Sequence, residues 1–299
     1  MNNFIEYFYG IKVQNVICND KYYSFIYNGY VYRLYVYEND VDVSFLYDIN
    51  KRLINDTLMS QIILNSDNEV VSSYNGFSYI LIKVFVNINK SISLEEISFI
   101  SNSFSKENLN INWGTLWSNK IDYLEDLINE NGKKYPIIVD SFNYFVGMCE
   151  NAIAYFNSIT LDNNYKYVVC HKKIKFDDMV DSLYNPLNLT FDYKVRDVAE
   201  YIKNSFFNNN YNIFNELISY LNKEQLSLME VKLLISRLMY PSFYFEMYED
   251  ILIDNKEEKI ILAVVSKLDE YEQYLDKIIS FLGRYYQVDE IMWLKYKDS

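Results

Sequence analysis

Three short segments decide how this 299-residue sequence is interpreted: Cys170-His171-Lys172-Lys173, Leu189-Thr190-Phe191-Asp192-Tyr193 and Arg196-Asp197-Val198-Ala199. His171 is the only histidine, and it closes a short β-rich run over residues 165–171. Neighbouring side chains on a strand point to opposite faces, so Cys170 and His171 would not act together. With no nearby serine or cysteine nucleophile in a plausible arrangement, the histidine is poor evidence for a catalytic triad.

The composition excludes several classes of protein. Lys plus Arg number 28 against 41 Asp plus Glu, and a net charge of −13 disfavours binding to a nucleic-acid backbone. Three cysteines without a CxxC motif, beside a single histidine, make a structural zinc site a poor interpretation. The N-terminal residues lack the features of a secretory signal, and no apolar run is long enough to span a membrane. We therefore expect a protein that is made in the cytoplasm and stays inside the cell.

Tyrosine is unusually frequent, with 31 residues in the chain. One interpretation is a coding bias in which tyrosine serves as a half-buried strand residue. The other is an adhesive or cross-linkable surface suited to a protein assembly. The exposure of these rings distinguishes the two interpretations.

The front of the chain has the pattern of a β-rich domain. Strands are predicted over residues 12–17, 21–27 and 29–37, a helix over 41–56, and two more strands over 70–74 and 77–86. The pairs Asn28-Gly29 and Asn75-Gly76 indicate tight hairpin turns. A short linker over residues 86–90 then leads into sequence with helical periodicity.

The rest of the chain is predicted to be mostly helical. Helices are expected over residues 93–103, 113–130, 142–159, 195–207, 212–221, 228–237, 244–253, 257–268 and 271–285. The expected organisation is thus an α+β protein with a β-rich N-terminal lobe over residues 1–88 and a helical C-terminal lobe over residues 89–299.

This order of motifs resembles the aminoglycoside phosphotransferase and choline kinase branch of the protein-kinase-like fold. Within that branch, the sequence is most similar to the spore-coat-associated kinase-like proteins of the CotS and YutH type. The segments that carry the resemblance are residues 117–125, 147–155, 170–174, 183–188, 195–201 and 240–245. The resemblance implies two lobes, an antiparallel sheet in the first and mainly helices in the second. It also implies a scaffold role for His171, which in such kinases bonds to backbone beneath the catalytic loop.

Several groups that a phosphotransferase needs are replaced in this sequence. Lys173 stands where the resemblance places the catalytic base, and a charged lysine has donors only, so it cannot accept a proton. Tyr35 takes the place of the nucleotide-binding lysine on the third strand. Arg33, two residues away on the same face, is the nearest cation and is a weak candidate for nucleotide binding. The turn at residues 18–21 contains no glycine to cover the phosphates.

The remaining acidic residues are weak candidates for metal binding. Asp178 stands five residues beyond the base position, where the resemblance places a metal-binding asparagine, and Asp192 is the best remaining candidate for a magnesium ligand. If Phe191 is the aromatic residue of the Asp-Phe-Gly-like motif, however, Thr190 takes the ligand position and Asp192 follows it. Arg196 and Asp197 are interpreted as structural residues at a helix start.

The sequence therefore favours a catalytically degraded kinase-like protein, a pseudokinase, with no cofactor. The resemblance implies a role in spore coat assembly or binding, other coat proteins as partners, and a possible location in the spore coat; a homo-oligomer is an open alternative. The competing hypothesis is an active small-molecule phosphotransferase that uses ATP and magnesium, with Asp192 on the metal and Asp178 as an unconventional base.

Overall fold

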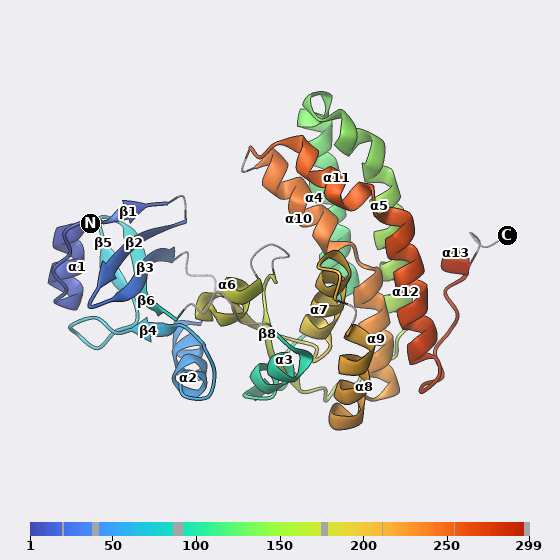
Figure 1. Cartoon of the computed structure of the whole chain (residues 1–299), viewed down its shortest axis with the longest axis horizontal. Coiled ribbons are helices and arrows are strands. Elements are labelled where there is room, and N and C mark those ends of the chain that lie inside the picture. The colour runs from blue at the N-terminus through green and yellow to red at the C-terminus, as the bar shows by residue number, and fades with distance from the viewer. Residues whose placement is uncertain are drawn as a thin grey trace. The chain divides into compact units, whose positions relative to one another are not determined.

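The computed structural model describes residues 1–19, 21–37, 42–85, 92–174, 179–210, 212–253 and 255–295. The chain forms two compact units. Unit 1 comprises Met1–Ser105 and Val168–Phe191, and unit 2 comprises Lys106–Tyr167 and Asp192–Ser299. The boundary expected between residues 88 and 89 lies outside the described residues. Figure 1 shows the strands and helices of each unit.

An antiparallel sheet forms the body of unit 1. Its order is β1-β2-β3-β6-β4, and β5 also pairs with β6. The strands are β1 (Ile17–Cys18), β2 (Tyr22–Tyr27), β3 (Tyr30–Tyr37), β4 (Gln61–Ile63), β5 (Ser72–Tyr74) and β6 (Phe77–Val84). The strand expected over residues 12–17 was wrong, because only Ile17 and Cys18 pair with β2.

Both predicted hairpin turns are present. Tyr27 pairs with Tyr30 across the first turn, and Tyr74 pairs with Phe77 across the second. Asn75 and Gly76 have φ angles of 50° and 81°, which is the left-handed backbone that a two-residue hairpin turn requires. The Asn-Gly pairs therefore fix the register of β2 with β3 and of β5 with β6.

The two faces of β3 have different surroundings, because side chains alternate along a strand. Tyr32 and Leu34 are buried in a cluster with Phe4 and Ile5 of helix α1 (Asn2–Tyr9), an element that the sequence analysis did not predict. Figure 1 shows α1 beside the sheet. Arg33 and Tyr35 consequently belong to the opposite face.

Helix α2 (Val43–Leu53) lies within the region predicted to be helical. Asp42 caps its N-terminus by accepting hydrogen bonds from the amides of Ser44 and Phe45. The buried Asn50 side chain donates to the Ser60 carbonyl at 2.6 Å and accepts from the Ile62 amide at 2.9 Å. Asn50 thus ties α2 to the start of β4.

A second, three-stranded sheet follows the order β7-β8-β9, with β7 at Ser105–Lys106, β8 at Tyr167–His171 and β9 at Leu189–Asp192. All its residues except Lys106, Tyr167 and Asp192 belong to unit 1. The same unit contains α3 (Leu94–Ser101), α6 (Met179–Tyr184) and the 3-10 turn η2 (Pro186–Asn188). The sequence analysis predicted no helix over residues 179–184, so it missed α6.

Unit 2 is a helical assembly. Its helices are α4 (Trp113–Asn131), α5 (Pro136–Asn157), α7 (Arg196–Phe207), α8 (Ile213–Glu224), α9 (Leu228–Met239), α10 (Ser242–Leu252), α11 (Leu262–Val265), α12 (Leu268–Leu282) and α13 (Met292–Lys295), with 3-10 turns η1 (Gly132–Lys134) and η3 (Glu258–Ile261). Helix α5 packs against α4 and α9, and α9 packs against α7. The helix predicted over residues 257–268 was wrong, because η3 and the short α11 occupy that stretch.

Tyrosines form much of the core. Tyr193, Tyr244, Tyr248 and Tyr271 are among the largest fully buried side chains. Others are exposed, Tyr7 most of all at 78%. The buried rings favour the interpretation that tyrosine serves mainly as a packing residue here. Within the described parts of the chain, no helix combines the length and the apolar character needed to cross a bilayer.

Candidate functional site

His171 lies at the end of β8 and is 1% exposed. Its Nε2 is 3.0 Å from the carbonyl oxygen of Leu183 in α6. The Asn188 side chain accepts from the amide of Lys173 at 3.1 Å and donates to the carbonyl of Lys173 at 2.6 Å. The turn after β8 is therefore held by side chain–backbone hydrogen bonds to residues that follow it in sequence.

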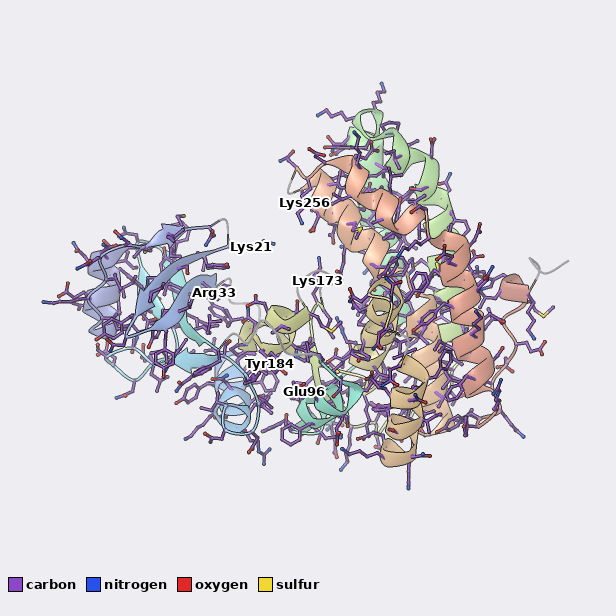
Figure 2. All side chains as sticks on the ribbon, viewed as in Figure 1. Lys21, Arg33, Glu96, Lys173, Tyr184 and Lys256 are labelled. Carbon is purple, nitrogen blue, oxygen red and sulfur yellow. The ribbon has the colours of Figure 1, made fainter. Side chains whose placement is uncertain are left out.

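Helix α6 is anchored firmly within unit 1. Leu183 is fully buried, and the Ser60 amide donates to the Tyr184 carbonyl at 2.8 Å. The Tyr184 hydroxyl donates to Glu96 of α3, and Figure 2 labels both residues. Burial, reinforced by the Glu96 carboxylate, raises the pKa of Tyr184, so the hydroxyl stays protonated as a donor. Helix α6 is thus held at its C-terminal end by Leu183 and Tyr184.

Arg33 of β3 forms an ion pair with Asp181 of α6. The distance between Arg33 Nη1 and Asp181 Oδ1 is 2.5 Å, and the two side chains are 18% and 32% exposed. The guanidinium also lies 4.7 Å from the centre of the Tyr22 ring and donates to the Tyr35 hydroxyl at 3.4 Å. The sequence analysis named no partner for Arg33, and the structure supplies an acidic one from α6.

The environment keeps Arg33 charged and Tyr35 neutral. Burial acts to lower the pKa of Arg33, but Tyr35 and Asp181 outweigh it and the pKa is raised. Burial raises the pKa of Tyr35 to about 12, although Arg33 acts in the opposite direction. Tyr35, which the sequence analysis placed at the position of the nucleotide-binding lysine, therefore offers a neutral hydroxyl, which also accepts from Asn185 Nδ2 at 3.4 Å.

Phe191 of β9 packs against α2. Its ring centre is 4.3 Å from that of Phe45, which also makes an edge contact with Phe104 at 6.5 Å. Phe191 thus connects β9 to α2 through an aromatic contact.

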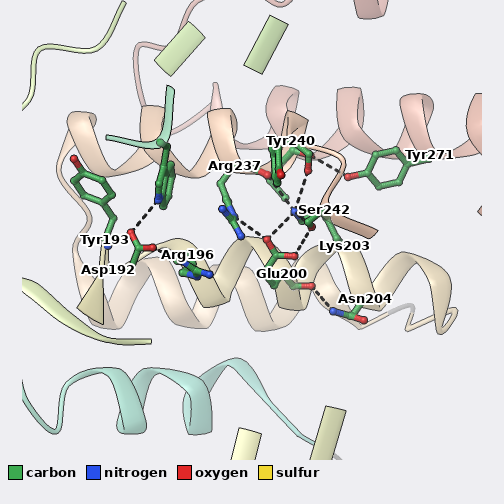
Figure 3. A network of polar contacts seen from close by, with 12 residues as sticks. Asp192, Tyr193, Arg196, Glu200, Lys203, Asn204, Arg237, Tyr240, Ser242 and Tyr271 are labelled. Carbon is green, nitrogen blue, oxygen red and sulfur yellow. Dashed lines mark hydrogen bonds and ion pairs between the residues drawn. The ribbon is translucent and has the colours of Figure 1, made fainter. Parts of the chain in front are cut away.

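Asp192 is buried in unit 2 and both of its oxygens accept hydrogen bonds. Oδ1 accepts from Trp113 Nε1 at 2.9 Å and from the Tyr193 amide at 2.7 Å, while Oδ2 pairs with Arg196. Asp192 is 2% exposed. Figure 3 shows the carboxylate between the Tyr193 and Arg196 side chains. These contacts indicate a structural role for Asp192, which forms an ion pair with Arg196 at the start of α7.

A second buried ionic cluster, which the sequence analysis missed, lies one turn further along α7. Glu200 Oε1 accepts from Lys203 Nζ at 2.8 Å and from Arg237 Nε at 2.7 Å, and Oε2 accepts from the Ser242 hydroxyl at 2.7 Å. Lys203 also donates to the carbonyls of Arg237 and Tyr240. Figure 3 shows how α7, α9 and α10 meet in this cluster.

Burial and ion pairing together shift the pKa values of Glu200 and Lys203. Burial acts to raise the pKa of Glu200, but the charges of Lys203 and Arg237 lower it to about 2. Burial lowers the pKa of Lys203 to about 8, against the opposing effect of Glu200. The sequence signal for this cluster was the spacing of Glu200 and Lys203 on one helix face. Because such pairs are usually solvated, the spacing did not indicate a buried cluster.

The predicted site residues are divided between the two units. Arg33, His171 and Lys173 belong to unit 1 and Asp192 to unit 2, whereas Asp178 lies outside the described residues. Over residues that the structure describes, no three His, Cys, Asp or Glu side chains are grouped as a metal site would require.

Comparison with known proteins identifies the family. A sequence profile described as "Spore coat putative kinase YutH" matches residues 2–285, nearly the whole chain. The chain belongs to the YutH family. A curated member, the endospore coat-associated protein YutH of Bacillus subtilis strain 168, is 30% identical over 192 residues. That match covers 58% of this chain and 54% of the relative, so it spans about half the length of that protein.

Solved structures show the fold of this YutH family member. An aminoglycoside phosphotransferase from Alicyclobacillus acidocaldarius matches with a TM-score of 0.64 at 10% identity, over 92% of this chain and 94% of that chain. An AMP-bound spectinomycin phosphotransferase matches with a TM-score of 0.56 at 14% identity, over 93% of both chains. The predicted fold class is confirmed: an antiparallel-sheet N-terminal region and a mostly helical remainder, in the kinase-like fold.

Proposed function

We propose that this chain is a catalytically degraded kinase-like protein that acts as an assembly or binding component of the spore coat. Its membership of the YutH family and the coat association stated in the name of the Bacillus subtilis relative support the coat role. The partners we propose are other coat proteins, and self-association is compatible with that role. We propose no nucleotide and no metal as a resident cofactor.

The observation that carries the loss of catalysis is the state of Asp192. An aspartate that binds magnesium must have a carboxylate oxygen available to the ion. Both oxygens of Asp192 are instead used by Trp113, Tyr193 and Arg196, with the carboxylate 2% exposed. These contacts support the proposal that Asp192 holds no magnesium, and in the register where Phe191 is the motif aromatic, Thr190 supplies no carboxylate at the ligand position.

The position of the base supports the same conclusion. Lys173 is held by Asn188 through its backbone, and its ammonium group has no lone pair with which to take a proton from an alcohol. General base catalysis contributes about 10²–10⁴-fold in rate. Loss of the base and of the metal carboxylate together removes most of the rate that a phosphotransferase needs.

The experiment uses a spore-forming host from which the gene has been deleted. We expect a fluorescent fusion of the protein, and of its Lys173→Ala variant, to localise equally to the coat of developing spores. A wild-type fusion that stays diffuse in spores with a normal coat would overturn the coat role. Loss of localisation only in a folded Lys173→Ala variant would overturn the claim that the position has no catalytic function.

Nucleotide binding is measured separately with the purified protein. Saturation at 100-fold above Kd raises the free energy of unfolding by about 2.7 kcal/mol. We expect ATP with magnesium to leave the melting temperature unchanged. A saturable rise, absent with magnesium alone, would instead support the active phosphotransferase.

A further inference from the structure

Arg33 lies on the face of β3 that does not contact α1. Its strand neighbours are Ser24 on β2 and Ile82 on β6, and Tyr35 follows it on the same face, between Tyr22 and Ile80. The aromatic ring of Tyr22, the hydroxyl of Tyr35 and the guanidinium lie together on this face of the sheet. A charged guanidinium of this kind binds carboxylates and phosphates well.

The segment after His171 supplies the anion. Asp181 of α6 contacts Arg33 at 2.5 Å, and Asn185 donates to Tyr35 at 3.4 Å. Two residues of one ten-residue segment, 179–188, thus engage Arg33 and Tyr35 on this face of β3. The contact is made within unit 1, so it does not depend on the placement of unit 2.

The same segment is held in place independently of Arg33. Asn188 donates to the carbonyl of Ser182 at 2.7 Å, Tyr184 bonds to Glu96, and the Ser60 amide donates to the Tyr184 carbonyl. These anchors fix α6 at its C-terminal end and bring the Asp181 carboxylate to the guanidinium. A tethered group of this kind acts at an effective concentration in about the millimolar range.

We infer that the Asp181 carboxylate occupies the anion-binding position at the Arg33 guanidinium. A phosphate-bearing ligand can therefore bind to this face of β3 only when Asp181 has moved away from Arg33. The inference rests on the proposed function, because it gives a reason why this site of a kinase-like fold would not hold a nucleotide. The pair of Arg33 in β3 with Asp181 in α6 is then an autoinhibitory contact within one chain.

The experiment measures the binding of inorganic pyrophosphate by isothermal titration calorimetry. We expect Asp181→Asn to bind this probe at least about tenfold more tightly than the wild type, because the competing carboxylate is gone. The double variant Asp181→Asn with Arg33→Gln should lose that gain. Asp289→Asn removes the same charge from an exposed pair with Lys232 and should bind no better than the wild type.

Asp181→Ser serves as a second variant, and circular dichroism verifies that each variant is folded. Equal pyrophosphate affinity in the wild type and both Asp181 variants would overturn the inference, as would a gain that persists without Arg33. Binding of ATP and magnesium to the wild type would overturn the proposed function instead. The two failures are therefore distinguishable.

Discussion

The buried cluster around Glu200 gives the sharpest prediction about stability. Lys203 and Arg237 share this one carboxylate, and their side chains are only 2% and 8% exposed. The substitution Glu200→Gln keeps the shape but removes the negative charge, which leaves two buried cations without the carboxylate that they share. Removing one partner of a buried ion pair costs about 3–5 kcal/mol. We expect a loss in the upper part of that range, because two cations are affected.

Urea unfolding followed by tryptophan fluorescence measures this loss. The Arg237 guanidinium lies 5.3 Å from the Trp113 ring centre and 5.8 Å from that of Trp117, so their emission reports on this part of unit 2. A Trp293→Phe background removes the third tryptophan of the chain. The fit gives the unfolding free energy from the midpoint and slope.

The matched control is Glu290→Gln. Glu290 pairs with Lys295 at 2.8 Å, but these side chains are 69% and 44% exposed, so we expect a change of about 0–1 kcal/mol. A Glu200→Gln variant that unfolds with a free energy within about 1 kcal/mol of the wild type would refute the view that this cluster organises α7, α9 and α10.

Three other predictions follow from the same geometry. The stability that ionised Glu200 contributes is fully present above its unfolded pKa of about 4.5 and is lost as the pH falls through its folded pKa of about 2. Between these two pH values, the unfolding free energy of Glu200→Gln should therefore fall by about 3 kcal/mol less than that of the wild type. Gly76→Ala should lower the melting temperature of unit 1, at a cost of about 1 kcal/mol, because Gly76 has a φ of 81°; Gly147→Ala, on a helix with open space around it, should not. Trp113→Phe should cost about 1–3 kcal/mol in urea unfolding by removing the indole donor to Asp192, and an unchanged stability would contradict the structural role of that carboxylate.

The sequence was sufficient to predict the fold because local signals and the order of motifs agree. The Asn-Gly pairs set two hairpins, and helical periodicity correctly indicates α4, α7 and α9. Strand 12–17 was mispredicted because the β-branched residues Val13, Val16 and Ile17 favour an extended backbone whether or not it has a pairing partner. Helix α1 has no acidic residue in its first turn and no basic residue in its last turn to indicate it, and its stability comes from packing Phe4 and Ile5 on the sheet.

The candidate site was only partly predictable. That Lys173 and Tyr35 stand in place of residues needed for phosphotransfer stays a prediction from the resemblance, because it depends on the register with the family motif as well as on residue type. The partners of Arg33 and Asp192 could not be predicted, because Asp181 and Trp113 are 148 and 79 positions away from them in the chain. Contacts at such separation are set by tertiary packing, which no local pattern encodes.

The most direct measurement of the central claim is single-turnover release or transfer of the γ-phosphate of ATP, with magnesium and excess protein. We predict a rate equal to that in buffer, for the wild type and for Lys173→Ala alike. A saturable rate in the wild type that Lys173→Ala or Asp192→Asn abolishes, with both variants folded, would contradict the account.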